Sequence, residues 1–313
     1  MFKNLNPEAL GLSTSQNELI ELALSFGFRG IDLDVVELAA QVKEQGLPKA
    51  RRLLDSAKLK IGAFKLPVRW YADEATFRGD LQKLPDLLGP AVEIGATRAM
   101  TNIEPASDER PYHQNFEFHQ KRLAELAAAL EPKGVRLGVG FSAAASDRQG
   151  KAFEFIHTLD ALLMLLGMTP AKNLGVSLDL WHLWASGGSF DVVRTKLKPE
   201  QIVAVQVADV ADPGPEPEGQ TPDGQTPDGQ TPDGQPIASR RLPGETGTID
   251  TPAVLTALAE MGYSGPVTPL PHSSQFAGMR RDQIVKLAGE RLDAAWKAAG
   301  LSPAGKLSAV AGR

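Results

Sequence analysis

A carboxylate and an imidazole stand three residues apart, immediately after an apolar run. The run covers residues 174–178, and Asp179 and His182 follow it. At the end of a buried strand both side chains would face the pocket where the strand ends, and there they could bind a substrate or a metal ion. The alternative is structural: Asp179 caps the next helix and His182 packs at the surface. The rest of the chain has to decide between these interpretations.

The composition is that of a globular protein without an obvious macromolecular partner. The 313 residues are 42% hydrophobic and 23% charged, which is enough for a full core. The net charge of -5 gives no broad basic field for nucleic acid or an anionic membrane. The absence of cysteine excludes disulfides, thiolate ligands and a cysteine nucleophile. With no signal-peptide pattern at the N-terminus and no apolar run of about 20 residues, we expect a cytoplasmic protein.

Short apolar runs alternate with longer amphipathic segments along the chain. Eight strand candidates occupy residues 9–12, 30–34, 60–64, 98–103, 135–141, 174–178, 202–207 and 265–270. Helical patterns follow them, among others at residues 36–57, 74–94, 116–130, 153–166, 251–261 and 281–299. This alternation predicts an α/β protein, a single-domain (β/α)8 TIM barrel over residues 1–300.

A doubly wound open sheet is the rival architecture. No G-x-G-x-x-G follows the first strand and no G-x-x-x-x-G-K-[ST] occurs, so the barrel is favoured and no nucleotide cofactor is expected.

One segment differs in composition from the rest. Residues 212–235 contain Gln-Thr-Pro-Asp-Gly three times in tandem, after the seventh strand candidate. A segment of this composition can bury little apolar surface, so it is predicted to be a low-complexity loop insertion. It could be a lid at the catalytic rim or an expanded loop in solvent. Residues 301–313 are small and polar and read as a flexible C-terminal tail.

Four segments together resemble the xylose isomerase-like TIM barrels, the sugar phosphate isomerase/epimerase superfamily with endonuclease IV as a distant relative. They are Asn173 to His182, Val205 to Asp209, Arg241 to Asp250 and Gly262 to Val267. The resemblance implies a divalent metal, Mn, Mg, Co or Zn, at the C-terminal mouth of the barrel. It also implies Glu, Asp, His and Glu ligands from four strand ends, and proton abstraction beside a carbonyl by the two glutamates.

The family's site transfers only in part. Its glutamate positions fall at Gly140 and Leu270, and its histidine ligand falls at Gln206. Asp179 is retained as a ligand, and His182 keeps the substrate-contacting position. A metal held by Asp179 and Gln206 alone would bind weakly, because an amide oxygen is neutral. The resemblance therefore implies a degenerate metal site that lacks both acid–base glutamates.

Other side chains near strand ends are candidates to complete the site. His272 shares a face with Leu270 and is a substitute base beside His182, or a plain rim histidine. Glu104 after the fourth strand and Lys65 after the third could contact substrate oxygens. Arg240 and Arg241 precede Leu-Pro-Gly, and one of them, taken as Arg241, could reach the substrate or simply pair with Glu245. Trp70 could stack on a sugar face or pack under a loop.

Three functions compete. The first is a sugar, sugar-phosphate or keto-polyol isomerase or epimerase that acts through an enediolate, with an altered or lost metal site. The second is a catalytically inactive carbohydrate-binding or regulatory barrel, which the missing glutamates favour. The third, a metal-dependent nuclease of the endonuclease IV kind, is weakest. Such a site needs many His and carboxylate ligands for several metal ions, whereas this chain has five histidines, mostly in the wrong places, and is acidic overall. The expected partner is a small sugar or polyol. Relatives are often dimers or tetramers, so a homo-oligomer is a further expectation.

Overall fold

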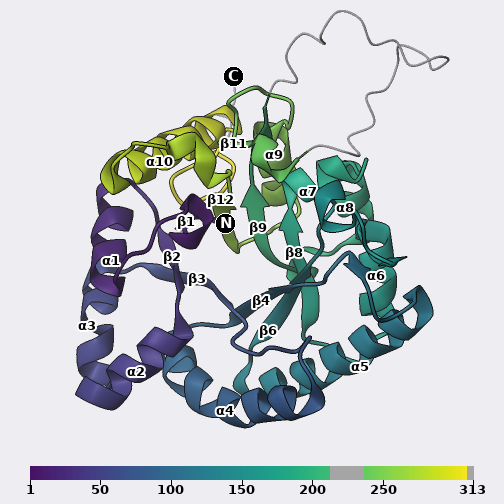
Figure 1. The fold of residues 1–313 in the computed structure, drawn as a ribbon. Coiled ribbons are helices and arrows are strands. Elements are labelled where there is room, and N and C mark those ends of the chain that lie inside the picture. The colour runs from purple at the N-terminus through teal and green to yellow at the C-terminus, as the bar shows by residue number, and fades with distance from the viewer. Residues whose placement is uncertain (212–235, 309–313) are drawn as a thin grey trace, which may run out of the picture.

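Eight parallel strands close into a barrel in the computed structural model, which describes residues 1–211 and 236–308 (Figure 1). Going round the barrel, the order is β1-β12-β9-β8-β6-β4-β3-β2, and β1 pairs with β12 to close it. The predicted (β/α)8 barrel is confirmed. The barrel strands are β1 (Phe2–Leu5), β2 (Gly30–Leu33), β3 (Lys60–Lys65), β4 (Arg98–Asn102), β6 (Arg136–Gly140), β8 (Leu174–Asp179), β9 (Ile202–Val207) and β12 (Pro266–Pro269).

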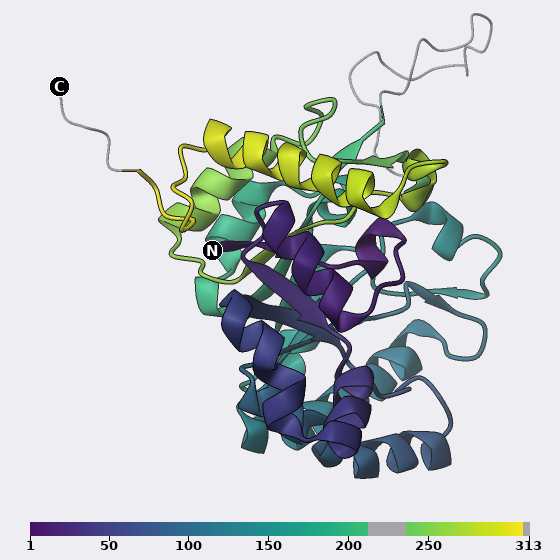
Figure 2. The same cartoon turned by 90° about the vertical axis from the view of Figure 1, so that its left-hand side faces the viewer.

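Helices surround the barrel as an outer ring, and Figure 2 shows α10 and α1 side by side on it. None of the helices in residues 1–211 and 236–308 is both long and apolar enough to cross a membrane. The helices are α1 (Gln16–Ser25), α2 (Val35–Gln45), α3 (Leu47–Ala57), α4 (Glu74–Glu93), α5 (Tyr112–Leu130), α6 (Leu159–Met168), α7 (Leu180–Ala185), α8 (Phe190–Lys196), α9 (Thr251–Glu260) and α10 (Arg281–Ala298).

The first strand lies earlier in the chain than the sequence pattern predicts. Residues 9–12 do not form a strand: Glu8–Leu10 is a 3-10 turn that ends at Gly11, whose φ is 70°. The strand is β1, whose buried polar residue Asn4 interrupts the apolar pattern. Asn4 faces other polar groups inside the barrel and donates to Asp32 Oδ1 at 2.7 Å, so a polar residue belongs there.

Two predicted helices also have different bounds. The segment 36–57 is divided by Gly46, whose φ of 81° ends α2 before α3 begins. The segment 153–166 begins as the short strand β7 (Phe153–Glu154), which pairs with β5 (Ala106–Ser107). The helix starts only after Thr158, whose side chain accepts from Ala161 N.

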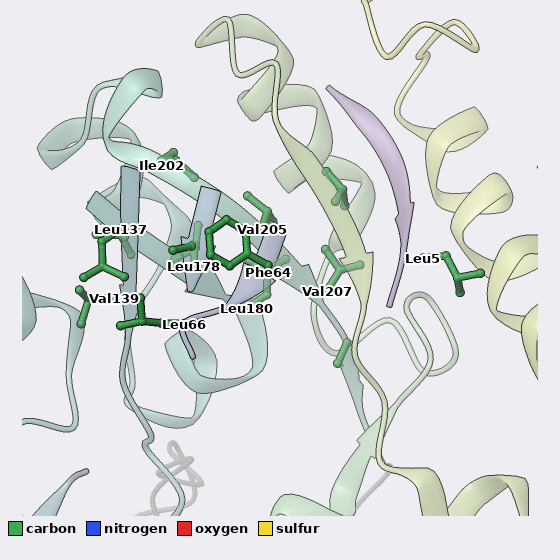
Figure 3. Packing of buried hydrophobic residues seen from close by; sticks show 14 of the residues in the cluster. Leu5, Phe64, Leu66, Leu137, Val139, Leu178, Leu180, Ile202, Val205 and Val207 are labelled. Carbon is green, nitrogen blue, oxygen red and sulfur yellow. The ribbon is translucent and has the colours of Figure 1, made fainter. Parts of the chain in front are cut away.

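The two faces of the barrel strands divide polar from apolar residues. Ser177, Asp179 and Gln206 border the cavity at the mouth, so the residues between them along each strand face the helices. Those residues are buried aliphatics, among them Leu178 and Val205, and Figure 3 shows several of them within the packed cluster. The hydrophobic core therefore lies between strands and helices, which leaves the mouth free for polar side chains.

A two-stranded antiparallel ribbon stands beyond β9. It pairs β10 (Asp209–Val210) with β11 (Arg240–Arg241), and Ala211 N donates to Ser239 O at 2.7 Å. The predicted loop insertion 212–235 lies outside the described residues. Of the predicted tail, residues 301–308 fold back through a bridge between Leu301 and Leu307, and the remaining residues are not described.

Candidate functional site

A cavity of about 300 Å³ lies at the carboxyl ends of the barrel strands. It is bordered by residues from β4, β6, β8, β9 and β11, by the turn after β1 and by the segment that follows β12. This is the end of a TIM barrel at which ligands bind. The lining residues that matter for chemistry are Glu8, Asn102, Gly140, Ser177, Asp179, His182, Gln206, Arg240, Leu270 and His272.

Asp179 caps the next helix and also borders the mouth cavity. Its Oδ1 accepts from the backbone N–H of Trp181 at 2.9 Å and of His182 at 3.3 Å, so it caps α7. Its Oδ2 accepts from Arg240 Nη2 at 2.7 Å, and the side chain also borders the cavity. Burial alone would raise the pKa of Asp179, but the charge of Arg240 and these hydrogen bonds lower it overall. The carboxylate is therefore ionised and fully engaged.

Arg240 crosses the mouth between two strand ends. Besides the bond to Asp179, its Nη1 donates to the carbonyl oxygen of Leu270 at 3.3 Å. The guanidinium carbon lies 4.9 Å from the centroid of the Trp181 ring, within cation–π range. The residue is 4% exposed, so its charge is held in a low-dielectric position beside the cavity.

His182 has a fixed tautomer. The backbone N–H of Ala143 donates to Nδ1 at 3.1 Å, so the proton of the neutral ring lies on Nε2. Burial, the largest cause, and the charge of Arg240 lower the pKa of His182 to about 4, against the opposing effect of Asp179. At neutral pH this imidazole is uncharged and presents an N–H donor instead of a base.

The residues at the mouth do not fit the metal that the resemblance implies. All four family ligand positions border the cavity, but Gly140 and Leu270 have no side-chain atom that could ligate a metal, and Asp179 is paired with Arg240. A Cβ at Gly140 would stand 2.2 Å from Asn102 Oδ1, so Asn102 fills the space of the missing side chain. Within residues 1–211 and 236–308, no cluster of three or more His, Cys, Asp or Glu side chains could hold an ion. Gln206 is left as a neutral amide facing the cavity.

Two further predicted residues lie near this cavity, but only one borders it. His272 is half-buried at the rim, and its Nδ1 lies 2.7 Å from Ser274 Oγ and accepts from Ser274 N at 3.3 Å. Arg241 instead donates to the backbone carbonyls of Ala238 and Arg240 at 3.1 and 3.2 Å. Neighbours on a strand face opposite sides, so the arginine at the mouth is Arg240.

The other three predicted residues are not gathered into the mouth cavity. Glu104 borders a second cavity of about 280 Å³, together with Tyr71 and His119. Lys65 is exposed at the end of β3 and borders neither cavity. Trp70 is 1% exposed and donates from Nε1 to Thr101 Oγ1 at 2.8 Å, so it packs in the core.

Two residues at the mouth, Glu8 and Asn102, are not among the candidates that the sequence suggests. Glu8 lies on the turn after β1, a stretch taken for the approach to a strand. Asn102 is the last residue of β4, and its polar type at a strand end was the available signal. Between Arg240 and Arg241 the sequence does not decide, because an offset of one residue reverses the face of a two-residue strand.

Asp209 explains the motif that the resemblance picked out at residues 241–250. Its Oδ1 accepts from Val210 N and Ile249 N at 2.9 and 3.0 Å, and its Oδ2 accepts from Thr246 N and Gly247 N at 2.8 and 2.7 Å. The buried carboxylate thus fixes the loop that follows β11. Its role is to hold the segment that carries Arg240.

The model of the xylose isomerase-like TIM barrel matches residues 20–291. The chain belongs to this family. A xylose isomerase domain protein from Alicyclobacillus acidocaldarius is similar in structure, with 25% identity and a TM-score of 0.80 over 96% of this chain and 99% of that one. Among curated proteins there is no match.

Two more distant structures share the fold. The IOLI protein, whose crystal structure contains a zinc atom, is 17% identical with a TM-score of 0.73, over 96% of this chain and 98% of that one. A D-psicose 3-epimerase studied with D-fructose is 13% identical with a TM-score of 0.71, over 96% of this chain and all (100%) of the other.

Proposed function

We propose that this barrel binds a small sugar or keto-polyol in the mouth cavity and moves a proton on the carbon beside its carbonyl. The observation that supports the proposal is the pairing of an N–H donor with a free carboxylate at one cavity. His182 supplies the donor for a carbonyl oxygen, and its neutral state suits that role because it loses no proton to the developing enediolate. The 3-epimerases among the structural neighbours are consistent with this reaction class.

Glu8 is the base in this proposal. The carboxylates that border the cavity are Glu8 and Asp179, and Asp179 is occupied by Arg240 and the α7 backbone. Glu8 is exposed, and no described residue hydrogen-bonds or pairs with its carboxylate. A positioned general base contributes about 10²–10⁴-fold to rate. The amides of Asn102 and Gln206 are available for the hydroxyl groups of the ligand.

The test is hydrogen exchange with solvent. D-fructose and other keto-sugars are incubated with the protein in D2O containing EDTA, and proton NMR follows the signal of the carbon beside the carbonyl. We expect exchange with at least one sugar, and a loss of at least about 100-fold in Glu8→Gln. Glu21→Gln, an exposed glutamate on α1, is the matched control and should exchange as the wild type does.

Two results would count against the proposal. Full exchange in Glu8→Gln would remove Glu8 as the base. If the protein binds a sugar but no keto-sugar exchanges the proton beside its carbonyl with solvent, a carbohydrate-binding barrel without catalytic activity is favoured.

A further inference from the structure

We propose that Arg240 and His182 form an oxyanion-binding site in which the guanidinium takes the place of a metal ion. The proposal rests on the proposed function only in taking the mouth cavity as the place where the ligand binds. It assigns to this cavity a ligand class: a compound with a carbonyl or carboxylate oxygen that carries, or acquires, a single negative charge.

The guanidinium of Arg240 lies where the resemblance implies a metal ion. Arg240 bonds directly to two of the four family ligand positions, through Asp179 Oδ2 at 2.7 Å and the Leu270 carbonyl at 3.3 Å. A metal ion would need the same Asp179 oxygen. The guanidinium and a metal ion are therefore alternatives at this site, and the chain has the guanidinium.

Arg240 and His182 have N–H donors left over for a ligand. A guanidinium has five N–H bonds, and the described residues accept two of them from Arg240. Its Nε is buried with no partner among the described residues. A ligand oxygen in the cavity that Arg240 borders would therefore accept from the second N–H of Nη1 or Nη2 and not from Nε. The Nε2–H of His182 borders the same cavity and likewise lacks an acceptor within the described residues.

The charge balance sets the ligand class. Asp179 already neutralises the charge of Arg240, so the pair together has no net charge. Such a site favours an oxygen that gains one negative charge during the reaction, as an enediolate oxygen does. A phosphate dianion would find too little positive charge. A planar carboxylate fits the fork of the guanidinium and serves as a stable probe.

The first experiment uses glycolate as that probe, with EDTA present to remove metal ions. Binding is measured by NMR titration of the full chain. We expect saturable binding by the wild type, weaker binding of inorganic phosphate, and at least about a tenfold loss of glycolate affinity in Arg240→Ala. Arg241→Ala is the matched control and should bind as the wild type does.

Removal of the guanidinium leaves Asp179 buried without its partner, so a second variant protects the test. Arg240→Lys keeps the positive charge and loses the planar fork, and circular dichroism confirms its folding. We expect it to lose at least about tenfold in glycolate affinity as well. Unchanged glycolate binding in both Arg240 variants would overturn the proposal.

The second experiment uses Mn²⁺ alone and detects it by electron paramagnetic resonance. We expect no binding at millimolar Mn²⁺ by the wild type or by the double variant Gln206→His/Leu270→Glu. Adding Arg240→Ala to that double variant should create a Mn²⁺ site, because Asp179 is then free to ligate. Stoichiometric Mn²⁺ binding by the wild type that is lost in Asp179→Asn would refute the replacement of the metal by Arg240.

The two proposals fail separately. A protein that binds glycolate through Arg240 but exchanges no keto-sugar proton would refute the isomerase or epimerase function and leave the oxyanion site standing. Exchange that persists in Arg240→Lys, with unchanged glycolate affinity, would do the reverse.

Discussion

Replacing Asp209 by asparagine should destabilise the whole barrel, although it changes one oxygen to an amide nitrogen. Each carboxylate oxygen accepts from two backbone N–H groups, at 2.7 to 3.0 Å. An amide in either orientation turns two of these four bonds into contacts between donors. Hydrogen bonds to a charged group contribute about 1.5–3 kcal/mol each, so the loss is about 3–6 kcal/mol.

Dividing this loss of free energy by the entropy of unfolding gives the expected fall in melting temperature. Unfolding entropy is about 2.1 cal/mol/K per residue, which gives about 0.66 kcal/mol/K for the 313 residues of this chain. Asp209→Asn should therefore melt about 5–9 °C below the wild type in calorimetry at pH 7. Hydrogen exchange should accelerate as well, either at the amides of Thr246 and Gly247 or at those of Val210 and Ile249, since one of these two pairs loses its acceptor.

Asp34→Asn is the matched control. Asp34 caps α2 through one oxygen only, which accepts from Val36 N and Glu37 N at 2.9 Å each, and asparagine keeps that oxygen. Asparagine and aspartate are about equally good N-caps, so this variant should melt within about 1 °C of the wild type. A loss for Asp209→Asn no larger than that of Asp34→Asn would refute the reasoning.

Three further predictions concern pH and chain length. Burial lowers the pKa of His119 to about 4, so its contribution to stability is lost as the pH falls from about 6.5 to about 4, by about 3 kcal/mol; His119→Phe should melt with a flatter pH profile than the wild type, and the exposed His113→Gln should not. Burial raises the pKa of Asp32 to about 6, so the folded state holds this proton more tightly and pays a penalty that grows as the pH rises from about 4 to about 6; relative to the wild type, Asp32→Asn should gain up to about 3 kcal/mol over that interval in urea unfolding, and a constant difference would contradict this. Deletion of residues 214–235 should change the melting temperature by less than about 5 °C, because the ends of the segment are already joined at Ala211 and Ser239 and loop closure depends weakly on length; a larger fall would mean that the insertion stabilises the barrel.

The barrel was predictable because its core faces outward from the strands. Each strand carries buried aliphatic side chains, such as Leu178 and Val205, that pack against the surrounding helices. The strands therefore stand out in the sequence as short apolar runs between the longer amphipathic segments of the helices. The first strand, β1, was not predicted because one of its buried residues is polar and not aliphatic. Asn4 faces the interior and bonds to Asp32 and Thr268, contacts that lie 28 and 264 residues away and leave no local trace.

The predicted residues that border the mouth cavity lie on barrel strands or shortly after them: Asp179 and His182 with β8, Gln206 on β9 and His272 after β12. Asp179, Gln206 and Leu270 border one cavity, as the resemblance implies. Arg240 could not be chosen over Arg241, because an offset of one residue reverses the face of a two-residue strand. The consequence for chemistry is large, since that offset decides whether a cation lies beside Asp179.

The ion pair between Arg240 and Asp179 also bears on how such a barrel could change in evolution. While the arginine is present, a new carboxylate at position 270 would meet the guanidinium before it met a metal ion. If the arginine is lost first, Asp179 stays buried without a partner, at a cost of about 3–5 kcal/mol out of a typical total of about 5–15 kcal/mol. Each single step towards a metal site is therefore unrewarded or harmful while Arg240 and Asp179 are paired.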